Sequence, residues 1–152
     1  MSVAFRRDGD EEHLEPKFEV PIPPGPNLVT ADGRALIDTR IAALEAEIPA
    51  LTDETALSAA KRDLRYWQRR LATAELQSGP SGDRAMFGHR VRFALNGKER
   101  EVHIVGHDEA DPAKGALAFT APLARALLGA EVGDFVDFNG QEEAIEVLAL
   151  HV

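Results

Sequence analysis

The chain has 152 residues, of which 44% are hydrophobic and 28% are charged, and its formal net charge is −9. This length suits one medium domain, or a small domain with an extended arm. Because the phosphate backbone of nucleic acid repels an acidic protein, we expect no stable direct binding to DNA and favour a protein partner with a basic surface. The absence of cysteine excludes disulfides and thiolate metal sites.

No apolar run approaches the roughly 20 residues that a membrane span requires, and residues 1–10 lack the apolar core of a secretory signal. We therefore expect a cytoplasmic protein without membrane association. Residues 1–27 are acidic and then rich in proline, and they show no helical or strand period. We interpret them as a flexible acidic, proline-rich tail.

Residues 28–76 carry two helical patterns that are separated by a short turn. Thr30 is a candidate N-cap for the first helix, and the apolar residues after it recur at alternating spacings of four and three. Pro49 ends this helix, because the residue before a proline avoids the helical conformation. A second apolar seam covers residues 57–74. The two seams predict an antiparallel helical hairpin, whose longer arm extends roughly 30 to 35 Å at about 1.5 Å per residue.

The apolar period changes in the second half of the chain. Residues 77–86 form a linker by composition, and the residues that follow alternate with a period of two, as β-strands do. Two Asn-Gly pairs, at 96–97 and 139–140, predict hairpin turns. Residues 122–129 begin with proline and end with glycine, which predicts one short helix. We expect residues 87–152 to form an antiparallel sheet with this helix, so the chain belongs to the α+β class.

Three segments of this half resemble motifs of the GreA/GreB transcript-cleavage factors in order and spacing. They are residues 104–112, which read Ile-Val-Gly-His-Asp-Glu-Ala-Asp-Pro, residues 122–129 and residues 132–134. The resemblance covers residues 87–150 and implies an FKBP-like domain preceded by a coiled-coil arm. It also implies that the domain binds the rim of the secondary channel of bacterial RNA polymerase, while the arm enters this channel.

The resemblance also implies which residues bind the polymerase. They are Asp108, Glu109, Ala121, Pro122 and Leu123, and Ala121 replaces a serine of the family. The structural alternative for residues 122 and 123 is a helix that starts with proline and buries its leucine. For the acidic loop around residue 108 the alternative is a solvated loop. The histidines show no metal-ligand spacing, so we expect no bound metal.

In the family, acidic residues at the arm tip help to hold a catalytic Mg²⁺ ion and a water in the polymerase active centre, which then cleaves its own backtracked RNA. With residues 59–61 as the anchor, the first of these acids corresponds to Ala50 and the second to Asp53, with Glu54 beside it. The two helices together are shorter by roughly three heptads, which removes on the order of 15 Å of reach from each. Asp53 and Glu54 are therefore candidate tip acids, or else they favour the helix N-terminus by about 0.3 to 1 kcal/mol each.

Arg62, Arg65 and Arg69, with Arg70 beside them, form a predicted basic face on the second helix. This face contacts RNA or an acidic polymerase surface, or it is the solvated flank of a coiled coil. Trp67 lies on the apolar seam and is predicted to be core.

The sequence thus predicts a protein that is not itself an enzyme, binds bacterial RNA polymerase at the secondary channel, and regulates elongation without efficient stimulation of transcript cleavage. It needs no cofactor, and Mg²⁺ matters only within the polymerase active centre, if the tip reaches it. The first alternative is a true cleavage factor that acts through Asp53 and Glu54.

Two further alternatives belong to other classes. An FKBP-like prolyl isomerase or chaperone needs an aromatic-lined pocket, but strand alternation assigns most of the available phenylalanines to the core. These are Phe87, Phe93, Phe119, Phe135 and Phe138. A homodimeric coiled-coil adaptor is disfavoured by the break at Pro49, which favours an intramolecular hairpin, so we expect a monomer.

Overall fold

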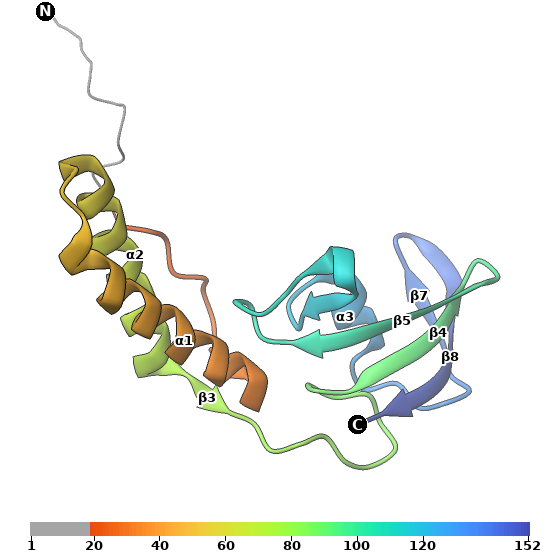
Figure 1. Cartoon of the computed structure of the whole chain (residues 1–152). Coiled ribbons are helices and arrows are strands. Elements are labelled where there is room, and N and C mark those ends of the chain that lie inside the picture. The colour runs from red at the N-terminus through yellow and green to blue at the C-terminus, as the bar shows by residue number, and fades with distance from the viewer. Residues whose placement is uncertain (1–18) are drawn as a thin grey trace, which may run out of the picture. The chain divides into compact units, whose positions relative to one another are not determined.

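The computed structural model describes residues 19–152, so the first 18 residues of the expected tail lie outside the described part. Two compact units share the chain: residues 39–72 with the described residues up to 24 form one, and residues 25–38 with 73–152 form the other. The elements, shown in Figure 1, are β2 (Leu28–Val29), α1 (Ala31–Glu47), η2 (Ile48–Ala50), α2 (Glu54–Thr73), β3 (Glu75–Leu76), β4 (Arg90–Leu95), β5 (Lys98–Val105), η3 (Pro112–Lys114), β6 (Ala116–Ala118), α3 (Pro122–Leu127), β7 (Phe135–Phe138) and β8 (Gln141–His151).

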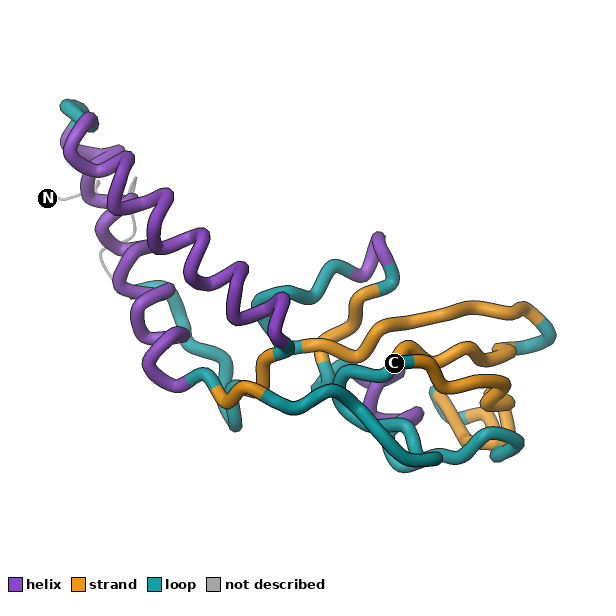
Figure 2. Tube along the Cα trace, turned by 60° about the horizontal axis from the view of Figure 1, so that its bottom comes forward, coloured by secondary structure: helices purple, strands orange, loops and turns teal. Residues whose placement is uncertain are grey.

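Helices α1 and α2 lie side by side and run in opposite directions (Figure 1, Figure 2), which confirms the predicted helical hairpin. Thr30 is the N-cap of α1, because its Oγ1 accepts a hydrogen bond from the Gly33 amide at 3.0 Å. The helix ends at Glu47, and the chain continues as a short 3₁₀ turn that contains Pro49. None of the helices in residues 19–152 is both long and apolar enough to cross a membrane.

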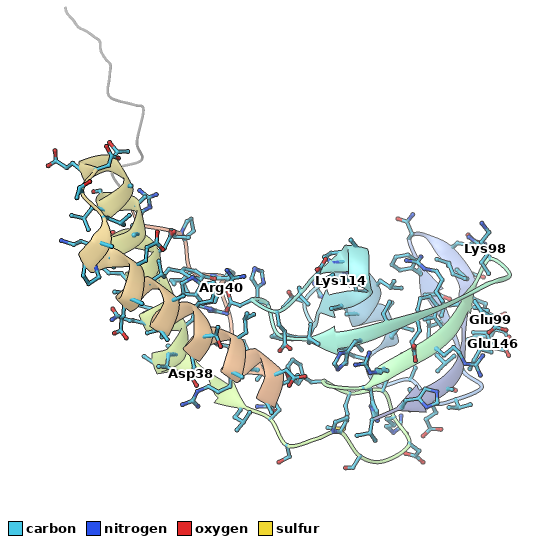
Figure 3. The ribbon with its side chains drawn as sticks, in the orientation of Figure 1. Asp38, Arg40, Lys98, Glu99, Lys114 and Glu146 are labelled. Carbon is cyan, nitrogen blue, oxygen red and sulfur yellow. The ribbon has the colours of Figure 1, made fainter. Side chains whose placement is uncertain are left out.

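The hairpin packs differently from the sequence prediction at two positions. Trp67 is half-buried instead of being core: Tyr66 lies edge-on to it with ring centroids 5.1 Å apart, and the Arg40 guanidinium, labelled in Figure 3, lies 5.8 Å from the ring centroid. Arg70 does not belong to a solvated basic face, because it is only 2% exposed. A long aliphatic stem allows an arginine to be covered in this way, which charge pattern alone does not indicate.

The second unit contains a five-stranded sheet with the order β6-β5-β4-β8-β7. All neighbours pair antiparallel except β5 and β6, which pair parallel, so the expected antiparallel sheet is corrected at this edge. The physical reason is the connection. The loop 106–115 with η3 carries the chain back along β5, and the His103 amide donates to the Gly115 carbonyl at 2.8 Å before β6 begins.

The hydrophobic core lies between this sheet and α3. Side chains with zero exposure from β4, β5 and β8 meet Ala124 and Leu127 of α3 in one cluster. Both predicted Asn-Gly turns are present, and their residues have positive φ: Asn96 at 51° and Gly97 at 82°, and a similar pair at 139–140. This is the conformation that a two-residue hairpin turn requires.

A second, two-stranded sheet was not predicted. β2 pairs with β3 in parallel, with Leu28 opposite Glu75. The Asn27 side chain is buried and donates to the Thr73 hydroxyl at 3.2 Å, and the Asn27 carbonyl accepts from the Glu75 amide at 2.8 Å. The segment that enters α1 is therefore fixed to the segment that leaves α2.

Candidate functional site

The acidic loop after β5 is organised around the Glu109 carboxylate. The Thr30 hydroxyl donates to it, with distances of 2.7 Å to Oε1 and 2.9 Å to Oε2. The amides of Thr30 and Gly106 each lie 3.3 Å from Oε2. Because Thr30 is also the N-cap of α1, the carboxylate connects this loop to the first turn of the helix, where negative charge is favourable. The predicted role of Glu109 in partner binding remains a prediction, and its carboxylate is engaged within the chain.

Two glycines permit this close approach. A Cβ atom on Gly33 would collide with the Glu109 carboxylate, and a Cβ atom on Gly106 would collide with the Leu28 carbonyl oxygen. Neither glycine has the positive φ that favours glycine for conformational reasons. Gly106 therefore requires glycine for lack of space, because its obstacle is backbone, whereas a side chain at residue 33 would displace the Glu109 carboxylate from its hydrogen bonds.

The loop carries two further acids. Asp108 and Asp111 are half-buried, and the Asp111 carbonyl accepts the Lys114 amide at 2.9 Å in the turn of η3. Within residues 19–152, no three or more histidine, cysteine or acidic side chains lie together in a way that could hold a metal ion.

The predicted docking edge lies at the start of α3. Ala121 is the N-cap, in an extended conformation without a side-chain cap hydrogen bond, and Pro122 occupies the first turn. Pro122 is exposed, whereas Leu123 is half-buried and packs against the hydrophobic core. The edge can therefore present the proline ring to a partner, while the leucine fixes the helix on the sheet.

The predicted tip acids are exposed where η2 leads into α2. Asp53 is the residue before the helix, and its Oδ2 accepts the Ala56 amide at 2.9 Å. Glu54 lies in the first turn and is exposed. Asp53 is thus a helix cap, in agreement with the structural alternative that it favours the helix N-terminus. The structure leaves a further role of either acid in catalysis as a prediction.

An ion pair with Glu19 forms on the basic face of α2, which we define as Arg62, Arg65 and Arg69. The Arg65 guanidinium donates from Nε and NH2 to the two carboxylate oxygens of Glu19, at 2.7 and 2.8 Å. This hydrogen bond is the main cause that lowers the pKa of Glu19 and raises the pKa of Arg65. The sequence pattern predicted the face but not its contact with the N-terminal segment.

A shallow cavity of about 220 Å³ lies beside the first turn of α1, lined among others by Asp32, Phe87 and His103. Burial lowers the pKa of the His103 imidazole, and the nearby charge of Arg90 acts in the same direction, although a hydrogen bond to the Gly88 carbonyl opposes the shift. The sequence pattern does not indicate this cavity, because its walls come from segments that are far apart in the chain.

The phenylalanines divide between core and surface. Phe93 is fully buried, and Phe87 and Phe119 meet edge-on with ring centroids 5.6 Å apart. Phe138 packs against the core, but Phe135 is 56% exposed on β7, so most of the five rings, though not all, are packed as predicted. Four of these five rings are therefore used in packing, so the rings do not gather into the aromatic-lined pocket that an isomerase needs.

Comparisons with known proteins find similarity to transcription elongation factors. The family model described as "Transcription elongation factor, GreA/GreB, C-term" matches residues 80–152, which contain the whole five-stranded sheet and α3. A protein of Sinorhizobium medicae named transcription elongation factor GreA is 42% identical over 74 residues, which are 46% of this chain and 47% of that protein. The chain thus matches about half the length of this curated relative.

Two further proteins are similar. The GreA of Nitratidesulfovibrio vulgaris is 48% identical over 56 residues, which are 36% of this chain and 34% of that protein. Among solved structures, GreA factor homolog 1 (Gfh1) of Thermus thermophilus matches with 19% identity and a TM-score of 0.41, and the match covers 84% of this chain and 100% of that chain.

Proposed function

Because the C-terminal domain of this chain, residues 80–152, belongs to the GreA/GreB family of transcription elongation factors, we propose that the protein binds bacterial RNA polymerase at the secondary channel and regulates elongation. The observation that carries this proposal is the family match over the complete sheet domain, together with a relative that is 42% identical over 74 residues. The helical hairpin of α1 and α2 supports it, because an arm of this kind is what the channel-entering role requires.

We further propose that stimulation of transcript cleavage is inefficient. The hairpin helices contain 17 and 20 residues, so the longer one measures about 30 Å at 1.5 Å per residue. Asp53 already uses one carboxylate oxygen as a helix cap, which leaves it fewer oxygens for a metal ion. Only Glu54 remains as an exposed tip acid without this structural duty.

The docking edge of this proposal is the start of α3. Pro122 is exposed there on a helix that Leu123 fixes to the core, so an apolar partner surface meets a rigid element. Ala121 is the N-cap of this helix, and Asp108 lies in the separate loop between β5 and η3. In this proposal the protein is not itself an enzyme, has no cofactor of its own, acts as a monomer and works in the bacterial cytoplasm.

The test uses backtracked elongation complexes of purified bacterial RNA polymerase with end-labelled RNA. The full chain is added, and both its co-migration with polymerase and the shortening of the RNA are followed in the presence of Mg²⁺. We expect co-migration and little shortening. A transcript cleavage factor that acts at the same polymerase serves as the positive control, because it shows that the complexes are competent for cleavage.

The alternatives give distinct results in this assay. Efficient Mg²⁺-dependent shortening that is lost in Glu54→Gln would establish a true cleavage factor. Absence of co-migration would remove the proposal, and a proline-peptide isomerisation assay would then test the remaining enzymatic alternative.

A further inference from the structure

Strand β7 carries an exposed aromatic side chain at an edge of the five-stranded sheet. It stands last in the order β6-β5-β4-β8-β7 and lies beside β8 (Figure 1), so within residues 19–152 no strand pairs with its other side. Phe135 at the start of β7 is 56% exposed, although Val136 and Phe138 of the same strand pack against the core. An exposed ring on an unpaired strand edge is a combination that a partner segment can cover.

The strand register places Phe135 on the face of the sheet opposite to the hydrophobic core. Phe135 pairs with Glu146 of β8, and Glu146, labelled in Figure 3, pairs in turn with Ala94 of β4. The next residue along β8, Ile145, is fully buried in the core. Because successive residues of a strand point to opposite faces, the row of Phe135, Glu146 and Ala94 lies on the outer face.

Small residues leave a hollow of about 230 Å³ along this row. Its lining includes Phe135, Ala94 and Gly97, and the last two have little or no side chain to fill the space. Gln141 also lines the hollow, and its side-chain amide donates to Asn96 Oδ1 at 3.1 Å. This hydrogen bond ties the start of β8 to the turn between β4 and β5, so the hollow is bounded by connected elements.

The surroundings of the hollow are acidic. Residues 131–150 contain six acidic residues and no lysine or arginine. Glu143 and Glu146 line the hollow, and neither carboxylate forms an ion pair within residues 19–152. Glu99, which pairs with Ala94 at the far end of the row, differs because the Arg92 guanidinium lies 2.8 Å from its carboxylate. In the described chain, two carboxylates without a counter-ion and one exposed ring therefore border the same space.

This combination fits an arginine side chain from another protein. A guanidinium has a planar face that stacks on an aromatic ring, and its five donors suit carboxylate acceptors. The phosphate backbone of a nucleic acid would be repelled by these acids. A second copy of this chain is also disfavoured, because pairing two β7 edges would bring Asp134 and Asp137 of each copy close to the same acids of the other.

We propose that the hollow bordered by Phe135, Glu143 and Glu146 is a docking site for an extended segment of a partner protein, which inserts an arginine between the ring and the carboxylates. The unpaired side of β7 allows the backbone of the same segment to lie along the strand. The site uses none of the residues of the docking edge at the start of α3. The inference therefore goes beyond the proposed function and does not rest on it.

The probe is the synthetic peptide acetyl-Thr-Val-Arg-Val-Thr-amide, titrated into the isotope-labelled full chain at about 150 mM NaCl, where diffuse attraction is screened. We expect saturable shifts of the amide signals of residues 94, 135 and 146 in nuclear magnetic resonance spectra. The matched peptide with glutamine in place of arginine should bind at least about threefold more weakly. Absence of saturable shifts with the arginine peptide would overturn the proposal, and so would equal affinities of the two peptides.

Two variants test the parts of the site separately. Glu146→Gln removes a carboxylate at nearly constant size, and Phe135→Leu removes the aromatic face but keeps an apolar side chain. We expect each to weaken binding of the arginine peptide roughly threefold or more. The matched control is Glu142→Gln, which removes the same charge from an exposed position of β8 outside the lining of the hollow.

The control separates a specific site from a general attraction to acidic surface. We expect Glu142→Gln to bind the arginine peptide like the parent, and an equal loss in Glu142→Gln and Glu146→Gln would overturn the arginine site. Unchanged amide signals of the buried core residues confirm that each variant remains folded. No polymerase enters these measurements, so their failure and the failure of the proposed function are distinguishable.

Discussion

At the scale of single residues, the Glu109 carboxylate is the most connected polar group of the candidate site. Glu109→Ala would leave the Thr30 hydroxyl, the Thr30 amide and the Gly106 amide without this acceptor in a half-buried position. We expect the free energy of unfolding to fall by about 1 to 3 kcal/mol. Urea denaturation measures this loss, and the exposed Glu142→Ala is the control, expected to stay within about 0.5 kcal/mol of the parent.

The effect of Gly33→Ala on stability is expected to depend on Glu109. An alanine inside a helix normally stabilises it by about 0.5 to 1 kcal/mol relative to glycine. Here the added Cβ would collide with the Glu109 carboxylate, so we expect Gly33→Ala to destabilise the parent protein.

In the Glu109→Ala background the obstacle is gone, and we expect Gly33→Ala to become neutral or stabilising. The difference between the two backgrounds in urea denaturation is the coupling between the residues. A destabilisation of the same size in both backgrounds would show that the collision with Glu109 is not the cause.

The buried His89 imidazole is expected to make the stability of the protein depend on pH. The imidazole is buried, burial lowers its pKa below the ordinary value of about 6.5, and its Nδ1 accepts the Met86 amide at 3.0 Å. The unfolded chain therefore binds a proton at a higher pH than the folded chain. Stability from this group is complete above about pH 6.5 and is lost as the pH falls below that value.

The variant His89→Asn tests this expectation, because asparagine can place an acceptor near the position of Nδ1 and does not titrate. We expect its free energy of unfolding to fall less than that of the parent between pH 7.5 and pH 5. Guanidinium denaturation at both pH values measures the difference. Equal losses in the two proteins would assign the acid sensitivity to other groups, such as His103.

At the scale of elements, two substitutions at Asp53 distinguish a structural role at the start of α2 from a role in catalysis. Its carboxylate caps α2 through the Ala56 amide, so Asp53→Ala should cost about 1 kcal/mol of stability, whereas Asp53→Ser keeps a cap and should cost much less. If Asp53 were needed for transcript cleavage, both variants would lose this activity to the same extent. We expect the stability difference, measured by thermal unfolding, and no cleavage activity that depends on Asp53.

The elements that local signals define could be predicted from the sequence. Thr30 caps α1, as predicted from its position directly before the apolar helical pattern, and α2 begins at Glu54. Each Asn-Gly pair forms a turn with positive φ, and α3 begins at Pro122. In each case the interaction that fixes the element lies within a few residues of the sequence pattern that predicts it. These local interactions also position elements of the candidate site.

The features that could not be predicted depend on residues far apart in the chain. Glu109 binds Thr30 across 79 positions, and Asn27 binds Thr73 across 46. The parallel pairing of β5 with β6 is set by the path of a loop and not by the strand pattern. Arg70 shares its residue type and helix with Arg65, yet packing buries one and leaves the other exposed. Periodicity describes a face of an element, but it does not identify what covers that face.

At the scale of the whole molecule, the chain combines a sheet domain that matches the GreA/GreB family model with a helical hairpin. The residues proposed to act on a partner occupy both parts: Pro122 on the domain, and Asp53, Glu54 and the basic face on the hairpin. A test of partner binding therefore needs a contact that a substitution can weaken in one part without unfolding the other. Pro122 offers such a test, because it is exposed and outside the core cluster.

We expect Pro122→Ala to weaken binding of the full chain to bacterial RNA polymerase about three- to tenfold, which corresponds to roughly 0.7 to 1.4 kcal/mol. The substitution removes apolar contact area from a rigid docking edge and leaves the helix fixed by Leu123. The matched control is Val132→Ala, which truncates an apolar side chain that is 56% exposed elsewhere on the same domain. Binding is measured by fluorescence anisotropy of the labelled chain, and equal affinities of the two variants would remove the start of α3 from the proposed docking surface.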